Sequence, residues 1–86
     1  MARWRVRVRV RLFASLREVA GQGEVELDLP PGATAEEAWR ELAGRYPALG
    51  ERRASLSAAV NRRYVAFDAP LGDGDELVFV PPVSGG

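Results

Sequence analysis

The sequence predicts an α+β fold in which a mixed sheet packs on one main helix and an exposed tail ends the chain. Three observations support this. The 86 residues can enclose one core but not two. Residues alternate between polar and apolar, as in a strand, at 3–12 and 24–29. One long helical pattern, at 35–46, carries an apolar stripe that a sheet must cover. We expect residues 1–86 to form a single domain, with residues 81–86 as a flexible tail.

The first half of the chain begins with a strand at residues 3–12, where arginines occupy one face and apolar residues the other. A short helix follows at 13–20, and Gly21 suits its left-handed C-terminal cap. A second strand at 24–29 ends at the prolines that follow it. Because only a short helix separates these strands, we expect them to pair antiparallel. Three carboxylates would then share a face with the arginine row: Glu24, Glu26 and Asp28.

The main helix begins after Thr34, because Thr34-Ala35-Glu36-Glu37 has the pattern of a capping box. In that motif the Thr34 hydroxyl and the Glu37 carboxylate each satisfy a free backbone amide at the start of the helix. Apolar residues then recur at helical spacing as far as Tyr46, and Pro47 ends the element.

The second half is expected to supply the rest of the sheet. Residues 48–56 are irregular and predict a loop or a short turn of helix, anchored by two leucines, with Glu51, Arg52 and Arg53 in solvent. Two short strands at 57–60 and 64–67 would turn at Asn61-Arg62-Arg63, where asparagine tolerates a left-handed backbone. A glycine- and aspartate-rich turn leads to the last strand, at 76–80, which ends at Pro81 and Pro82.

The composition excludes several classes of function. Twelve arginines balance twelve acidic residues, so a zero net charge argues against a dedicated nucleic-acid or membrane-surface protein. The chain has no cysteine, histidine or lysine, and it therefore lacks the usual nucleophiles, bases and zinc ligands. We expect a protein that is not an enzyme acting alone, that binds no cofactor or metal, and that resides in the cytoplasm because no signal or membrane-spanning pattern is present.

The C-terminal residues form the most informative motif. Pro81 and Pro82 cannot continue a central ladder, so Val83, Ser84, Gly85 and Gly86 are expected to project from the body. Glycines lack a Cβ atom and can enter a narrow slot. A carboxylate at such an end is a poor acyl donor, but a partner that uses ATP could activate it as an acyl adenylate. The chain would then carry chemistry that other proteins perform.

Several motifs resemble the small, sulfur-carrying subunits of molybdopterin synthase, the MoaD-like members of the ubiquitin-like family. The resemblance covers essentially the whole chain. It is carried by Leu12-Phe13-Ala14, Leu16-Arg17-Glu18, Gly21, Asn61, Phe67-Asp68, Pro70-Leu71, Asp73-Gly74-Asp75-Glu76 and Pro81-Pro82-Val83-Ser84-Gly85-Gly86.

The resemblance implies a ubiquitin-like β-grasp fold whose terminal Gly86 is the reactive site. An E1-like adenylating enzyme would activate Gly86 with ATP, and a sulfur-donating enzyme would convert it to a thiocarboxylate. The tail would enter the large subunit of molybdopterin synthase and deliver sulfur to cyclic pyranopterin monophosphate. Two deliveries build one dithiolene, which implies a heterotetramer of two small and two large subunits. The chain would be the non-catalytic sulfur donor of that sulfurtransferase.

The resemblance also implies a partner-binding apolar patch beside the base of the tail, made of Phe13, Tyr64, Phe79 and Val80. Phe13 and Phe79 could instead be core residues, and for Phe79 the two roles are equally plausible because strand parity alone does not decide the face on which it lies. Tyr64 follows two arginines in a predicted turn, and a large aromatic residue there favours a partner surface.

Other interpretations remain open at this point. The arginine row could attract RNA or another anion, but zero net charge favours a solvated strand face with ion pairs. The acidic group at 73–76 is typical of a turn and offers too few ligands for a cation. The tail could serve thiamin thiazole synthesis, tRNA thiolation or attachment to proteins. A β-grasp adaptor that binds through its sheet and never reacts is a further alternative.

Overall fold

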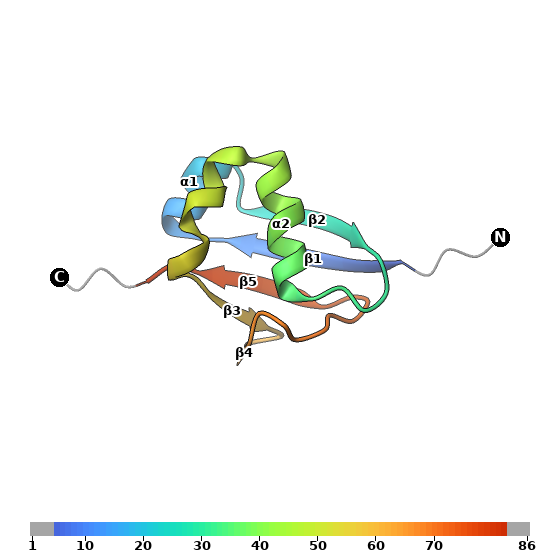
Figure 1. The fold of residues 1–86 in the computed structure, drawn as a ribbon. Helices are drawn as coiled ribbons and strands as arrows, with labels where there is room; N and C mark the ends of the chain where they lie inside the picture. The colour runs from blue at the N-terminus through green and yellow to red at the C-terminus, as the bar shows by residue number, and fades with distance from the viewer. Residues whose placement is uncertain (1–4, 83–86) are drawn as a thin grey trace.

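The structure is a computed structural model that describes residues 5–82. Its elements along the chain are β1 (Val6–Leu12), α1 (Ala14–Ala20), β2 (Glu24–Leu29), α2 (Ala35–Arg45), the 3₁₀ helix η1 (Pro47–Ser55), β3 (Ser57–Val60), β4 (Arg63–Val65) and β5 (Glu76–Val80). Figure 1 shows α2 lying across one face of the sheet, with α1 and η1 at one end of the same layer. None of the helices in residues 5–82 is long and apolar enough to cross a membrane.

The five strands form one mixed sheet in the order β2-β1-β5-β3-β4. β1 pairs antiparallel with β2, as predicted, and parallel with β5. β3 pairs antiparallel with both β5 and β4. The last strand therefore lies at the centre of the sheet, and a mixed sheet wrapped on one main helix is the ubiquitin-like β-grasp. The predicted fold class is confirmed.

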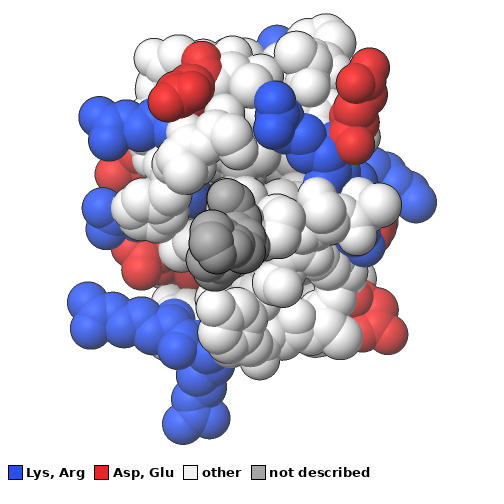
Figure 2. Space-filling model, turned by 90° about the vertical axis from the view of Figure 1, so that its left-hand side faces the viewer, with Lys and Arg blue, Asp and Glu red and all other residues white. Residues whose placement is uncertain are grey.

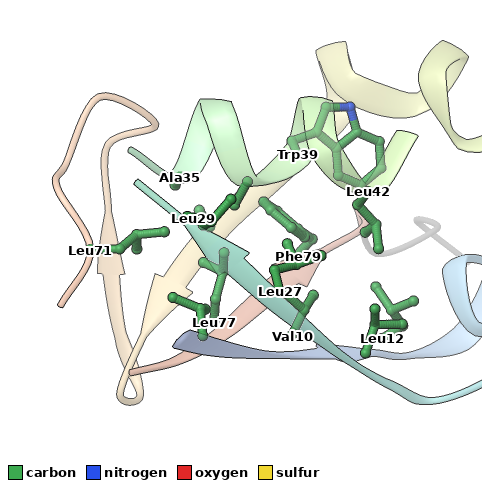
Figure 3. Close-up of a cluster of buried hydrophobic side chains, with 14 of the residues drawn as sticks. Val10, Leu12, Leu27, Leu29, Ala35, Trp39, Leu42, Leu71, Leu77 and Phe79 are labelled. Atoms are coloured by element: carbon green, nitrogen blue, oxygen red, sulfur yellow. The ribbon is translucent and has the colours of Figure 1, made fainter. Parts of the chain in front are cut away.

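The core lies between α2 and the inner face of the sheet (Figure 3). β1 buries every second residue from Val6 to Leu12, which confirms the predicted alternation there, with arginines on the outer face. The strand begins later than the predicted residue 3, and residues 3 and 4 lie outside the described residues. Trp39 of α2 meets Phe79 of β5 edge to face, with ring centroids 4.9 Å apart. An edge-to-face pair of this kind stabilises by about 0.5–1.5 kcal/mol beyond the area it buries.

The start of α2 follows the predicted capping box. The Thr34 hydroxyl accepts a hydrogen bond from the Glu37 amide at 3.2 Å, and the Glu37 carboxylate accepts one from the Thr34 amide at 2.9 Å. Two amides that have no partner within the helix are thereby satisfied. α2 ends at Arg45, one residue before the predicted end at Tyr46.

The segment after α2 is more ordered than predicted. It forms η1, whose Leu49 is fully buried as an anchor, and Leu56 just beyond it is buried as well. Arg53, which was expected in solvent, is instead half-buried. Its Nε donates to Glu36 Oε1 at 2.9 Å, and its guanidinium carbon lies 3.4 Å from the centroid of the Phe67 ring. Arg53 therefore ties η1 to α2 and to the segment after β4.

The hairpin between β3 and β4 turns at two residues rather than three. Val60 pairs with Arg63, so Asn61 and Arg62 alone form the loop, and β4 ends at Val65 rather than at Phe67. Both loop residues have positive φ, 50° for Asn61 and 73° for Arg62, which is typical of the tight type I′ turn.

Candidate functional site

The base of the C-terminal tail lies at the end of the central strand. β5 ends at Val80, which pairs with Ser57, and Pro81 and Pro82 follow without an amide hydrogen to extend the ladder. Pro81 is half-buried and Pro82 is exposed. The proposed reactive Gly86, with Gly85, Ser84 and Val83, lies outside the described residues. Pro81 and Pro82 thus follow the end of the central strand, which lies between β1 and β3.

An apolar surface covers the part of the outer sheet face that belongs to β5, β3 and β4. Strand register aligns Val78 with Ala59, and Ala59 with Tyr64, in one row across this face. Ala59 is buried and Val78 is half-buried, so the exposed area of this row belongs mainly to Tyr64. The Tyr64 side chain is 73% exposed, as predicted, although it stands in a strand. A tyrosine exposed to this extent, standing over smaller apolar residues, offers a contact for another protein.

Phe13 adds to this surface beside the tail base. It follows Leu12, which pairs with Phe79, and its extended backbone continues the alternation of β1. The side chain therefore leaves the core, is 46% exposed, and lies under the Arg11 guanidinium at 5.6 Å. Phe13 is thus not part of the helix that begins at Ala14, although its spacing had suggested a helical face. We name Phe13, Ala59, Tyr64, Val78 and Val80 the outer apolar surface.

Phe79 does not belong to this surface. Its exposure is 0%, and it packs between Trp39 and Phe67 on the inner face of the sheet. The expected partner-binding role of Phe79 is therefore corrected to a core role. Strand alternation is the physical reason: Phe79 shares its face with Leu77, whereas Val78 and the half-buried Val80 take the outer face.

Ala59 and Val78 were not singled out from the sequence, although they complete the outer apolar surface. Both are small or β-branched residues in short apolar runs, and such runs carry no polar alternation to mark an outer face. The cross-strand register supplies the missing information, because it places both residues beside Tyr64.

The β1 and β2 half of the outer face is charged and internally paired. Arg7 Nε lies 3.1 Å from Asp28, Arg9 Nε lies 3.2 Å from Glu24, and Arg11 contacts Glu76 at 3.4 Å. The hydrogen bond to Asp28 raises the pKa of the Arg7 guanidinium above its ordinary value. A shallow hollow of about 410 Å³ is lined here by equal numbers of arginines and carboxylates: Arg5, Arg7, Arg9, Glu26, Asp28 and Asp73, together with Gly74. Such a lining does not select for anions.

The acidic residues before β5 act as turn-forming groups. Asp73 accepts a hydrogen bond from the Arg7 amide at 2.8 Å, and Asp75 accepts one from the Gly72 amide at 2.7 Å. Asp75 also accepts from the Asn61 amide group at 2.9 Å. Within residues 5–82 no group of three His, Cys, Asp or Glu side chains is arranged to hold a metal ion.

Figure 2 views the molecule from the side on which β5 ends. Uncharged surface covers much of the described part of this face, and both basic and acidic side chains lie around its rim. The site therefore combines an exit point for the tail with an uncharged contact surface. This arrangement would let a second protein bind the folded body while the end of the chain extends from it. Among the described residues, it does not bring an acid, a base and a nucleophile together as a catalytic site would.

Comparison with known proteins supports the resemblance. The ThiS family model matches residues 10–86. The chain is 41% identical over 81 residues to a molybdopterin synthase sulfur carrier subunit of Escherichia coli, covering 92% of this chain and 99% of that one. It is 37% identical over 81 residues to the protein of the same name from Arabidopsis thaliana, covering 94% and 84%.

A solved structure agrees with these relatives. The crystal structure of SAMP1 from Haloferax volcanii has a TM-score of 0.85 and 35% identity, covering 93% of this chain and 99% of that chain. With a family match over most of its length and a central strand that leads into its last residues, the chain belongs to the ThiS family.

Proposed function

We propose that this protein is the sulfur carrier subunit of molybdopterin synthase. The observation that carries the proposal is the identity of 41% and 37%, over nearly the full chain, to proteins of that name. The fold supports it, because the central strand β5 leads into the tail and the outer apolar surface lies beside the exit point.

The reactive group in this proposal is the carboxylate of Gly86. A carboxylate oxygen attacks the α-phosphorus of ATP on an E1-like adenylating enzyme, and pyrophosphate leaves. Hydrosulfide supplied by a sulfur-donating enzyme then attacks the acyl carbon and AMP leaves. Loss of the sulfur-bound proton gives the thiocarboxylate. ATP is thus used by the activating partner, and the carrier itself binds no cofactor.

Sulfur delivery follows in the large subunit. The thiocarboxylate sulfur attacks a carbon of cyclic pyranopterin monophosphate and displaces an oxygen substituent from that carbon. Water then cleaves the acyl–sulfur bond, which leaves the sulfur on the pterin and restores the Gly86 carboxylate. Two deliveries complete a dithiolene, in a heterotetramer of two small and two large subunits. Docking of the folded body makes each transfer effectively unimolecular, which is where the carrier contributes to the rate. These steps take place in the cytoplasm.

Deletion of Gly86 tests the proposal. We expect the variant to fold and to bind the large subunit, but to deliver no sulfur in an assay of molybdopterin formation. Intact mass of the wild-type protein from cells that make the cofactor should show one oxygen replaced by sulfur. Arg40→Gln, on the solvent side of α2, is the matched control and should still bind the large subunit and deliver sulfur. Full sulfur delivery by the Gly86 deletion would contradict the proposal.

A second candidate is a protein modifier, favoured by the likeness to SAMP1 at 35% identity. In that role the activated Gly86 would acylate an amine of another protein instead of accepting sulfur. A search of cell extracts for proteins joined to Gly86 separates the two functions. Sulfur carriage for thiazole synthesis or tRNA thiolation is examined by mass spectrometry of thiamin precursors and of tRNA from cells in which the gene is deleted. A non-reactive adaptor would keep full activity without Gly86.

A further inference from the structure

The β3–β4 turn contains an arginine in a backbone conformation that ordinarily belongs to glycine. Arg62 has φ of 73° at the second central position of a two-residue turn. Asn-Gly is the preferred pair for this turn, because the second residue must adopt a positive φ and a Cβ atom there is strained. An exposed arginine at this position lowers stability relative to glycine, and the fold itself does not require it.

The neighbouring turn residue has a structural explanation that Arg62 lacks. Asn61 donates from its side-chain amide to Asp75 Oδ1 at 2.9 Å and accepts from the Glu76 amide at 3.0 Å. Asn61 therefore joins the turn to the start of β5. The Arg62 side chain makes neither a hydrogen bond nor an ion pair with any of residues 5–82.

Arg62 lies next to the outer apolar surface. The turn leads directly into β4, whose Tyr64 is the most exposed member of the outer apolar surface. The arginines of β1 on the same sheet face, Arg7, Arg9 and Arg11, are each neutralised by a carboxylate of this chain. Arg62 is thus a positive charge at the edge of the contact surface that no carboxylate of the described residues balances.

We propose that Arg62 is a partner-recognition residue: it meets a carboxylate on the large subunit of molybdopterin synthase when that subunit covers the outer apolar surface. Backbone strain of this kind is enriched at sites that bind ligands or partners. A charge at the rim of an interface acts mainly on the association rate and on the choice of partner. The inference rests on the proposed function and adds the chemistry of the facing surface, which is acidic beside Tyr64.

The proposal predicts that stability and binding change in opposite directions. Arg62→Gly removes the strain and the charge together, so its Tm should rise by about 4 °C while its association rate constant with the large subunit falls roughly threefold to tenfold at low salt. The difference from wild type should shrink at high salt because mobile ions screen exposed charges. An arginine with a purely structural role would lower stability on removal and leave the salt dependence unchanged.

Three variants separate charge from backbone effects. Arg62→Gln keeps a side chain and its strain, and should bind as weakly as Arg62→Gly without the rise in Tm. Arg62→Lys keeps the charge and should retain most of the association rate. Arg40→Gln removes one positive charge from the opposite side of the molecule and should associate like wild type.

The measurement is surface plasmon resonance of the full-length chain on the immobilised large subunit from the same genome, at several salt concentrations, with thermal unfolding of each variant. The inference is supported if Arg62→Gly and Arg62→Gln associate more weakly and with less salt dependence than wild type, while Arg62→Lys and Arg40→Gln do not. Equal association of these variants and wild type overturns it, as does an equal loss for Arg40→Gln. If wild type itself does not bind the large subunit, both this inference and the proposed function fail.

Discussion

At the scale of single residues, two aromatic side chains in neighbouring parts of the sheet have opposite roles. Phe79 is fully buried between Trp39 and Phe67, whereas Tyr64 stands mostly in solvent on the other face. The difference arises from strand parity, because residues one position apart point to opposite faces. Substitutions at the two positions should therefore affect different properties.

Phe79→Ala should lower the free energy of unfolding by about 3–5 kcal/mol, because it removes buried ring atoms and leaves a cavity beneath Trp39. A small domain has only about 5–15 kcal/mol in total, so partial unfolding at room temperature is expected. Urea unfolding followed by circular dichroism measures the loss. Phe79→Leu keeps most of the volume and should lose less. A loss below about 1 kcal/mol for Phe79→Ala would place this ring outside the core.

Tyr64→Ala should change the free energy of unfolding by no more than about 0.5 kcal/mol, because the side chain is 73% exposed. If the outer apolar surface binds the large subunit, the same change should weaken that complex about tenfold or more, since a tyrosine at an interface centre commonly contributes over 1 kcal/mol. Isothermal titration calorimetry measures the affinity. Tyr64→Phe retains the ring and should bind nearly as well as wild type.

Glu36 provides a pH-dependent contribution to stability. The hydrogen bond from Arg53 holds the pKa of the Glu36 carboxyl below its ordinary value of 4.5. The pKa of Glu36 is lower in the folded state than in the unfolded state. The contribution of this carboxylate to the free energy of unfolding is therefore complete above about pH 4.5 and is lost as the pH falls through the folded-state pKa. The stability difference between wild type and Glu36→Gln should therefore be largest near pH 7 and shrink toward pH 3. Thermal unfolding across this range measures it, and a constant difference would contradict the assignment.

At the scale of elements, local rules account for the starts and ends of helices. The capping box at Thr34 follows from four consecutive residues, and the left-handed Gly21 ends α1 as its position after the helical pattern suggested. The alternation of β1 also appears in the structure residue by residue. These features depend on neighbours in sequence, which is why they could be predicted.

Thr34→Ala should lower the free energy of unfolding by about 1 kcal/mol, because the Glu37 amide loses its acceptor. Urea unfolding again provides the measurement. Thr34→Ser keeps a hydroxyl at the cap and should remain within a few tenths of a kcal/mol of wild type. An equal loss in both variants would show that the methyl group, rather than the hydrogen bond, matters at this position.

Other elements could not be predicted because they depend on partners distant in the chain. The face of Phe79 is set by the register of β5 against β1 and β3. The burial of Arg53 depends on Glu36 and Phe67, which no periodic pattern connects to residues 47–55. Likewise, the two-residue turn follows from pairing between Val60 and Arg63, whereas the sequence alone suited a turn one residue longer.

At the scale of the whole molecule, the parallel pairing of β1 and β5 separates the two ends of the described chain. The chain enters β1 at one end of the sheet and leaves β5 at the other, as Figure 1 shows. Seven residues of β1 span roughly 20 Å. The end of β5, where the chain leaves the sheet, is therefore remote from the start of β1.

A protein fused before β1 should consequently leave sulfur delivery unchanged, whereas residues added after Gly86 should abolish it until they are removed. The first fusion lies beyond the far end of the sheet, and the second blocks the proposed reactive carboxylate. Molybdopterin formation with each fusion, before and after proteolytic trimming, measures the effect. Full delivery by the untrimmed C-terminal fusion would exclude Gly86 as the donor.

The same parallel pair determines how the body responds to mechanical load. Tension applied between the start of β1 and the end of β5 runs along both strands, so it shears the hydrogen bonds that join them all at once instead of opening them one after another. β5 is further held by β3 on its other side. A pull on the end of β5 against the start of β1 therefore has to break several of these hydrogen bonds together, so we expect the folded body to resist it.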